Sequence, residues 1–137
     1  MKARREIAIS QNSIRTLKGH ARKEQPNESC AVLFGKSEGS CFSVTGIFLV
    51  ENSLHSPVSF AISSDDLIRA YRELEARKLE VTAIFHSHPD SEAYPSPIDL
   101  KYMEINPVPW LIYSNTKDEL KAYILESEVV PVTVRVR

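Results

Sequence analysis

Apolar residues recur at helical spacing in two stretches of the chain. The first helix is predicted to begin after Ser10, with Ser10 or Asn12 as its N-cap, and to end before Pro26. The second is predicted to begin near Ser63–Asp66, which has the spacing of a capping box, and to extend through Arg77. The apolar stripes are Ile14, Leu17 and Ala21 in the first helix and Leu67, Ile68, Tyr71 and Leu74 in the second.

Runs of β-branched and apolar residues predict the strands. CAVLFG and CFSVTGIFLVEN, separated by the turn KSEGS, predict a hairpin. EVTAIFHSH predicts a buried strand, and a proline-rich loop leads from it to a third helix over residues 97–105. WLIYS, ELKAYIL and VVPVTVRVR predict three further strands, the last with one solvent-facing side. Strands and helices mix without regular βαβ alternation, so we expect an α+β fold, in a single domain spanning residues 1–137.

Composition and charge narrow the class of protein. The chain has 137 residues, of which 42% are hydrophobic and 26% charged, values typical of a soluble globular domain. A formal net charge of -1 gives no electrostatic case for binding nucleic acid or an anionic membrane. The basic start MKARREIAIS lacks a long apolar region and a small-residue cleavage site, so we expect no signal peptide. No apolar run approaches the length of a membrane span.

The two cysteines, Cys30 and Cys41, are too few to build a disulfide scaffold. A hairpin turning near Glu38-Gly39 does not bring them opposite each other. We therefore expect a reduced, cytoplasmic protein, with hyperthermophile proteins as the exception to this rule.

The stretch HSHPDSEAYPSPID, residues 86–99, combines the residue types of a metal site. His86 and His88 point to the same face at the C-terminal end of a strand, where two imidazoles can share one ion. Catalytic zinc commonly takes three protein ligands and keeps its fourth position for water. Asp99 is the obvious third ligand, because the loop needs to fold back only once, and three prolines stiffen it.

Each half of this pattern also has a purely structural interpretation. Histidine pairs of the form HxH occur by chance on surface strands. The residues SPID suit a helix start, with Ser96 as N-cap, Pro97 at the first helical position and Asp99 favourable to the helix dipole. The two interpretations are compatible, since a cap also holds Asp99 in place. A structural zinc site fits less well, because such sites usually have four ligands rich in cysteine.

A hydrolytic zinc site also needs a base that takes a proton from water. Glu28, in PNESCAVLFG, immediately precedes a predicted buried strand and is the candidate. On this stretch alone, a solvated glutamate in a turn is the simpler interpretation. Cys30 makes a Cys–His nucleophilic pair conceivable, but a buried structural cysteine is the commoner case. His20 and His55 are expected on a helix surface and in a loop, with no assigned role.

Taken together, these residues resemble the JAMM (MPN+) metalloprotease family of prokaryotic type, whose pattern is a distant glutamate followed by H-x-H-x7-S-x-x-D. Residues 86–99 match the second part without a gap, and PNESCAVLFG resembles the glutamate-bearing segment. One departure is Ala31, where glycine is expected. The resemblance implies an MPN/cytidine-deaminase-like fold, with a central, mixed, mostly antiparallel sheet flanked by helices.

The resemblance also implies a role for each matching residue. His86, His88 and Asp99 are expected to bind one Zn²⁺, with water in the fourth position. Glu28 is expected to accept a proton from that water and pass it to the leaving amine. Ser96 is expected to donate a hydrogen bond to the oxygen of the tetrahedral intermediate.

The resemblance further implies a zinc-dependent isopeptidase or peptidase that cleaves after the C-terminal glycines of ubiquitin-like modifiers or sulfur-carrier proteins. Its partner is then a protein with a Gly-Gly tail. Two alternatives remain: a non-catalytic MPN-type scaffold that binds partners, and a processing peptidase limited to sulfur-carrier precursors. The chain is expected to be a monomer, or a homodimer supported by an apolar edge such as GIFLV.

Overall fold

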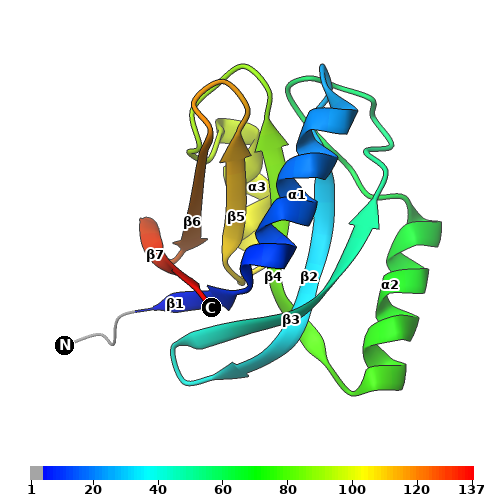
Figure 1. The fold of residues 1–137 in the computed structure, drawn as a ribbon, viewed down its shortest axis with the longest axis vertical. Coiled ribbons are helices and arrows are strands. Elements are labelled where there is room, and N and C mark those ends of the chain that lie inside the picture. Colours follow the sequence, from blue (N-terminus) through cyan, green and yellow to red (C-terminus); the bar gives the residue numbers. More distant parts are fainter. Residues whose placement is uncertain (1–4) are drawn as a thin grey trace.

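The computed structural model describes residues 5–137 and shows seven strands and three helices in that range (Figure 1). The strands are β1 (Glu6–Ile9), β2 (Cys30–Glu38), β3 (Cys41–Val50), β4 (Glu80–His88), β5 (Trp110–Ser114), β6 (Glu119–Leu125) and β7 (Val129–Val136). The helices are α1 (Gln11–Glu24), α2 (Ser64–Arg77) and α3 (Pro97–Ile105). None of the helices in the described range has the length and apolar character needed to cross a membrane.

The strands form a closed barrel in the order β1-β3-β2-β4-β5-β6-β7. Four pairs are antiparallel, namely β2–β3, β2–β4, β5–β6 and β6–β7. Three pairs are parallel, namely β4–β5, β1–β3 and β1–β7. The expectation of an α+β fold with a mixed, mostly antiparallel sheet is therefore confirmed.

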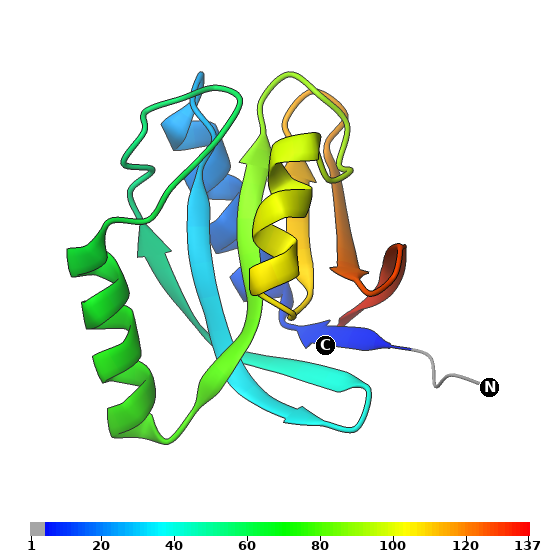
Figure 2. The ribbon, with the colours of Figure 1, turned by 180° about the vertical axis from the view of Figure 1, so that it is seen from behind.

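Helices cover both faces of the sheet and create two apolar cores. α1 lies on one face, and Figure 2 shows α3 on the opposite face. The predicted stripe of α1 packs into the larger core, which includes Phe85 and Leu111. α3 covers the smaller core, where Met103 packs near Trp110 and Ile112. Successive residues of β4 alternate between these cores, so this strand decides which side chains point toward α3.

The predicted helix starts are confirmed by their caps. Ser10, rather than Asn12, caps α1, and its side chain accepts a hydrogen bond from the Ser13 backbone N–H. Ser63 caps α2 by accepting from the Asp66 N–H. These bonds satisfy donors that a helix start otherwise leaves unpaired.

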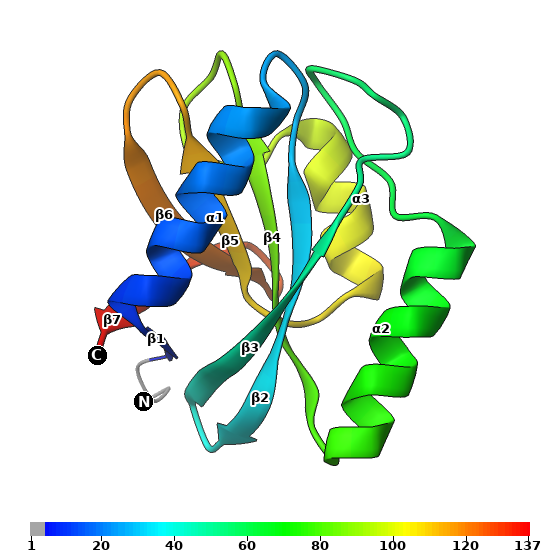
Figure 3. The same ribbon diagram turned by 45° about the vertical axis from the view of Figure 1, so that its right-hand side comes forward.

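The predicted apolar stripe of α2 is wrong in its orientation. Only Leu74 of the four residues is buried, while Leu67, Ile68 and Tyr71 are 37%, 49% and 58% exposed. α2 instead buries Asp66, Ala70 and Leu74. Figure 3 shows α2 to the side of the strands, away from α1.

Two further strand features were not predicted. The chain has a strand, β1, before α1, and its parallel pairing with both β3 and β7 closes the barrel. The predicted turn KSEGS is also shorter than expected, because residues 36–38 continue β2 and pair with β3. β2 bends at Gly35, where the register shifts, and a Cβ atom at this position would overlap the Ser43 carbonyl oxygen.

Candidate metal centre

The C-terminal end of β4 carries both imidazoles on the face covered by α3. His86 and His88 are almost completely buried, whereas Phe85 and Ser87 point to the opposite face. β4 is held on both sides at this point, because Cys30 of β2 and Ile112 of β5 both pair with His86. The sheet therefore fixes the direction of both rings.

Asp99 reaches the same place through the start of α3. The Asp99 N–H donates to the Ser96 side-chain oxygen at 3.1 Å, and the Ser96 N–H donates to Asp99 Oδ2 at 2.9 Å. This reciprocal pair is a complete capping box, with Pro97 in the first turn. The predicted ligand Asp99 is thus also the second member of the capping box.

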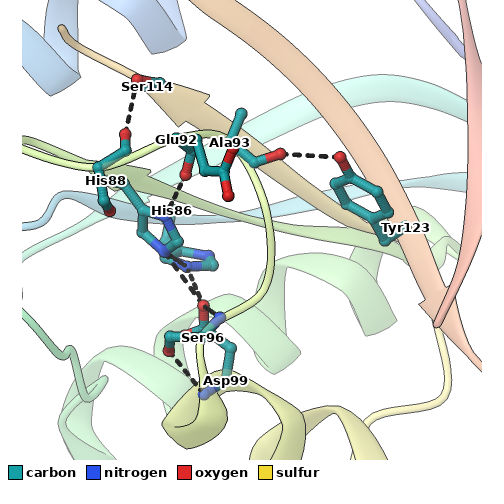
Figure 4. Close-up of polar contacts among 9 residues, drawn as sticks. His86, His88, Glu92, Ala93, Ser96, Asp99, Ser114 and Tyr123 are labelled. Atoms are coloured by element: carbon teal, nitrogen blue, oxygen red, sulfur yellow. Dashed lines mark hydrogen bonds and ion pairs between the residues drawn. The ribbon is translucent and has the colours of Figure 1, made fainter. Parts of the chain in front are cut away.

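Three potential ligand atoms converge (Figure 4). His86 Nε2 and His88 Nε2 lie 3.0 and 3.1 Å from Asp99 Oδ2, and 3.0 Å from each other. Tetrahedral zinc ligands at their usual bond lengths are about 3.3 Å apart, so the spacing suits one such ion. Among the described residues, His86, His88 and Asp99 are the His, Cys, Asp or Glu side chains whose ligand atoms lie close enough together to hold one metal ion.

In the metal-free site, Asp99 and His86 are in the charge states that a metal ligand needs, whereas His88 would have to release a proton. Burial raises the pKa of Asp99, but hydrogen bonds from both histidines outweigh it and hold that pKa well below its ordinary value. Burial lowers the pKa of His86 and keeps its ring neutral. Burial also opposes protonation of His88, but the bonds to Asp99 and to the Glu92 carbonyl raise its pKa overall. A carboxylate and imidazole nitrogens are ordinary zinc ligands.

The loop between β4 and α3 is held by three consecutive carbonyl groups. His88 Nδ1 donates to the Glu92 carbonyl at 2.8 Å, so Nε2, which faces Asp99, is the nitrogen that would lose its proton to bind a metal ion. The hydroxyls of Ser114 and Tyr123 donate to the carbonyls of Ser91 and Ala93 at 2.7 and 2.8 Å. Figure 4 shows these side chains reaching the loop from β5 and β6. The loop that joins the ligands is thus anchored on two neighbouring strands.

Glu28 lies beside the ligands rather than in a solvated turn. The register pairs Cys30 with His86, and the Ser87 N–H donates to the Ser29 carbonyl, so continuing the register sets Glu28 opposite His88. The Glu28 side chain is buried, and its Oε1 has no hydrogen-bond partner. Burial raises its pKa to about 8, an effect reduced by His88 and increased by Asp99. An unpaired buried carboxyl oxygen indicates a missing polar partner such as water.

The remaining candidate residues have structural positions. Burial raises the pKa of Cys30 to about 12, which disfavours the thiolate that a nucleophile requires. The ring of His20 lies 3.0 Å from the Cys30 carbonyl and connects α1 to β2. His55 is an exposed loop residue. Ala31 is fully buried in β2.

Two residues of the segment between β3 and α2 also belong to the site and were not found from the sequence. The ring of Phe60 stacks on His86 with the centroids 4.9 Å apart. Asn52 is buried and donates to the Glu28 carbonyl at 3.0 Å. The only signal in the sequence is an asparagine near the end of a long predicted strand, which by itself predicts a turn.

A groove of about 510 Å³ adjoins the site between α2, α3 and β4. Its wall is mainly apolar and includes Phe60, Leu67, Tyr71, Tyr102, Ile105 and Trp110. The exposed stripe of α2 therefore borders this groove. Phe60 lines the groove and also stacks on His86, so one ring separates the groove from the ligand.

Comparison with known proteins finds a matching family and several similar proteins. Residues 10–126 match the family described as prokaryotic homologs of the JAB domain. Desampylase from Pyrococcus furiosus is 41% identical over 101 residues, which cover 74% of this chain and 69% of that protein. CysO-cysteine peptidase from Mycobacterium tuberculosis is 31% identical over 121 residues, covering 85% and 81%. A probable TtuB-protein conjugate cleaving protease from Thermus thermophilus is 28% identical over 120 residues, covering 87% and 76%.

Solved structures show the same fold. A protein from Desulfitobacterium hafniense has a TM-score of 0.85 at 25% identity, covering 96% of this chain and 92% of that one. A JAB1/MPN domain protein from Archaeoglobus fulgidus has a TM-score of 0.60 at 18% identity, covering 96% and 98%. The second likeness concerns the fold alone.

Proposed function

Because this chain belongs to the prokaryotic homologs of the JAB domain, we propose that it is a zinc-dependent isopeptidase or peptidase. Its proposed substrates are ubiquitin-like modifiers or sulfur-carrier proteins, cleaved after their C-terminal glycines. The observation that carries the proposal is the convergence of His86 Nε2, His88 Nε2 and Asp99 Oδ2 beside the unpaired carboxyl of Glu28. The names of the relatives, a desampylase, a CysO-cysteine peptidase and a probable TtuB-conjugate protease, support the substrate class.

The three ligand residues are preset for one ion. When bound by them, zinc lowers the pKa of a water molecule to roughly 7 and polarises the carbonyl to be attacked. The sheet and the α3 capping box hold the three side chains in place, so little ordering is needed when the ion arrives. The burial of His86 and His88 excludes competing water from these ligands.

Glu28 is the proposed proton carrier. Its carboxylate accepts a proton from the attacking water and then gives it to the amine that leaves. Burial raises the pKa of Glu28 to about 8 in the metal-free protein, and the positive charge of a bound zinc would lower that pKa and favour the carboxylate.

Ser96 is the proposed oxyanion donor. Its side-chain oxygen accepts the Asp99 N–H, and this bond does not use the hydroxyl proton. That proton is therefore free to donate to the oxygen on which negative charge develops. Donors of this kind contribute on the order of 10²–10³ in rate in other hydrolases.

The proposal favours a protein substrate over a small polar one. The adjoining groove is mainly apolar and larger than a single peptide bond requires. Exposed apolar surface of this kind marks contact with another macromolecule more often than it marks a site for a polar metabolite. We propose a cytoplasmic location, which agrees with two free cysteines.

The test is a panel of substrates incubated with purified enzyme. The panel contains isopeptide conjugates of ubiquitin-like proteins and linear sulfur-carrier precursors with residues beyond the Gly-Gly tail. We expect cleavage at the terminal glycine that stops with a chelator, returns with zinc and is absent in Glu28→Gln. Chelator-resistant cleavage contradicts the proposal. Cleavage of precursors alone supports the processing alternative, and zinc binding without any cleavage supports the scaffold.

A further inference from the structure

The side chain of Asn52 organises the segment between β3 and α2. Asn52 is only 4% exposed, and no helix or strand occurs between Val50 and Ser64. Its Nδ2 donates at 3.0–3.3 Å to the backbone carbonyls of Glu28, Ser56 and Ser59. Its Oδ1 accepts at 3.1 and 3.2 Å from the backbone N–H groups of Leu54 and Ala61. One amide thus supplies partners that a helix or strand would otherwise provide.

The same segment holds the backbone of Glu28. The Glu28 carbonyl accepts from Asn52, and the Glu28 N–H donates to the Ser56 carbonyl at 2.8 Å. The next residue, Ser29, is bound by Ser87 of β4 through its N–H and its carbonyl. Glu28 therefore lies between β4 on one side and the Asn52-centred segment on the other. Because its Oε1 makes no hydrogen bond, these backbone contacts are the hydrogen bonds through which neighbouring segments hold Glu28 in place.

The segment also positions the ring that covers His86. Phe60 lies between Ser59 and Ala61, which are both bound by Asn52. Its ring stacks on His86 at an interplanar angle of 28°, and its centroid is 6.0 Å from that of Trp110. Asn52 is thus hydrogen-bonded to the backbone of Glu28, the proposed base, and to the two residues that flank Phe60.

We propose that Asn52 is a positioning residue for the reaction, one that aligns Glu28 and Phe60 with the three ligands without contacting the substrate. This inference rests on the proposed function. Asn52 differs from an ordinary loop asparagine because its bonds reach the base as well as its own loop. Displacing a reacting group by about 1 Å can lower a rate about 10²-fold, so alignment of Glu28 has a measurable effect.

Asn52→Asp is the test variant because it keeps the shape and the acceptor but replaces the donor that faces three carbonyls. Asn52→Gln, which retains the amide and shifts it by one methylene, is the second variant if Asn52→Asp does not fold. Val132→Ala, a buried residue of β7 far along the sheet, is a control for lowered stability alone. Asn12→Asp is the matched chemical control, because Asn12 is exposed in the first turn of α1, on the face of the sheet opposite α3.

Two measurements decide the inference. With folded, zinc-loaded enzyme as the reference concentration, kcat of Asn52→Asp should fall about 10- to 100-fold while KM changes less than about threefold. Amide hydrogen exchange at Glu28, whose N–H donates to a carbonyl that Asn52 also holds, should accelerate at least about tenfold, with exchange at residues 83–86 unchanged. Both control variants should keep the wild-type kcat.

Several outcomes overturn the inference. Wild-type kcat in Asn52→Asp does so, as does an equal loss of kcat in Val132→Ala at the same loss of melting temperature. Unchanged protection of the Glu28 amide does so whatever the kinetics show. If wild-type protein cleaves no conjugate, the proposed function fails, and the exchange measurement still decides whether Asn52 holds Glu28.

Discussion

Glu28 is a buried carboxyl with its pKa raised to about 8, and replacing it with glutamine in metal-free protein tests that burial. At pH values between 4.5 and 8, the folded protein keeps a proton on Glu28 that the unfolded chain releases. The unfolded chain then binds fewer protons, so stability falls as the pH rises. The contribution is complete below pH 4.5 and is lost as the pH rises through 8. Glutamine does not titrate, so Glu28→Gln should escape this loss.

The magnitude follows from the two pKa values. A tenfold change in an ionisation constant corresponds to about 1.4 kcal/mol, so the displacement from 4.5 to about 8 corresponds to at most about 5 kcal/mol. Between pH 5 and pH 9, the unfolding free energy of Glu28→Gln should gain about 4 kcal/mol relative to wild type.

The assay is urea unfolding in chelator-containing buffer at pH 5, 7 and 9, with free energies extrapolated to zero denaturant. Glu104→Gln, an exposed residue of α3, controls for the loss of one carboxylate and should differ from wild type by less than about 0.5 kcal/mol. A Glu28→Gln difference that stays constant across the three pH values refutes the reasoning. The buried environment assigned to Glu28 is then incorrect.

Three further substitutions separate roles within the site and the sheet. Ser96→Ala should lower the free energy of unfolding by about 1 kcal/mol, because the α3 cap is lost. It should also lower kcat about 10²–10³-fold, and a wild-type kcat contradicts the role of Ser96 as a donor. Cys30→Ala should retain zinc-dependent cleavage, and abolished cleavage with zinc still bound revives the Cys–His alternative. Gly35→Ala should lower stability by about 1–3 kcal/mol in thermal denaturation, because its Cβ overlaps the Ser43 carbonyl oxygen; an unchanged melting temperature contradicts this packing.

The parts of the fold and site that the sequence predicts depend on local rules. His86 and His88 share a face because strand residues alternate, whatever the rest of the chain does. Ser96 and Asp99 combine at the start of α3 because a capping box needs only four consecutive residues. The bounds of α3 follow from Pro97 at its first position. These local signals bring the ligands within reach of each other.

The parts that the sequence does not predict depend on distant partners. β1 has four residues and no strong pattern of its own, and it becomes a strand through β3 and β7. The stripe of α2 is apolar, but part of it borders a groove instead of packing into a core. Glu28 is buried because the β2–β4 register sets it opposite His88. Asn52 has no local signal that distinguishes it from a turn asparagine.

The proposed zinc site is tested most directly by the zinc content of the purified protein. This is measured by elemental analysis after the protein is loaded with zinc and excess metal is removed. If His86, His88 and Asp99 bind one zinc ion, wild type and Glu28→Gln should each contain one zinc per chain. Folded His88→Ala should contain almost none. Wild-type protein without zinc, or His88→Ala that retains a full equivalent, contradicts the proposed site.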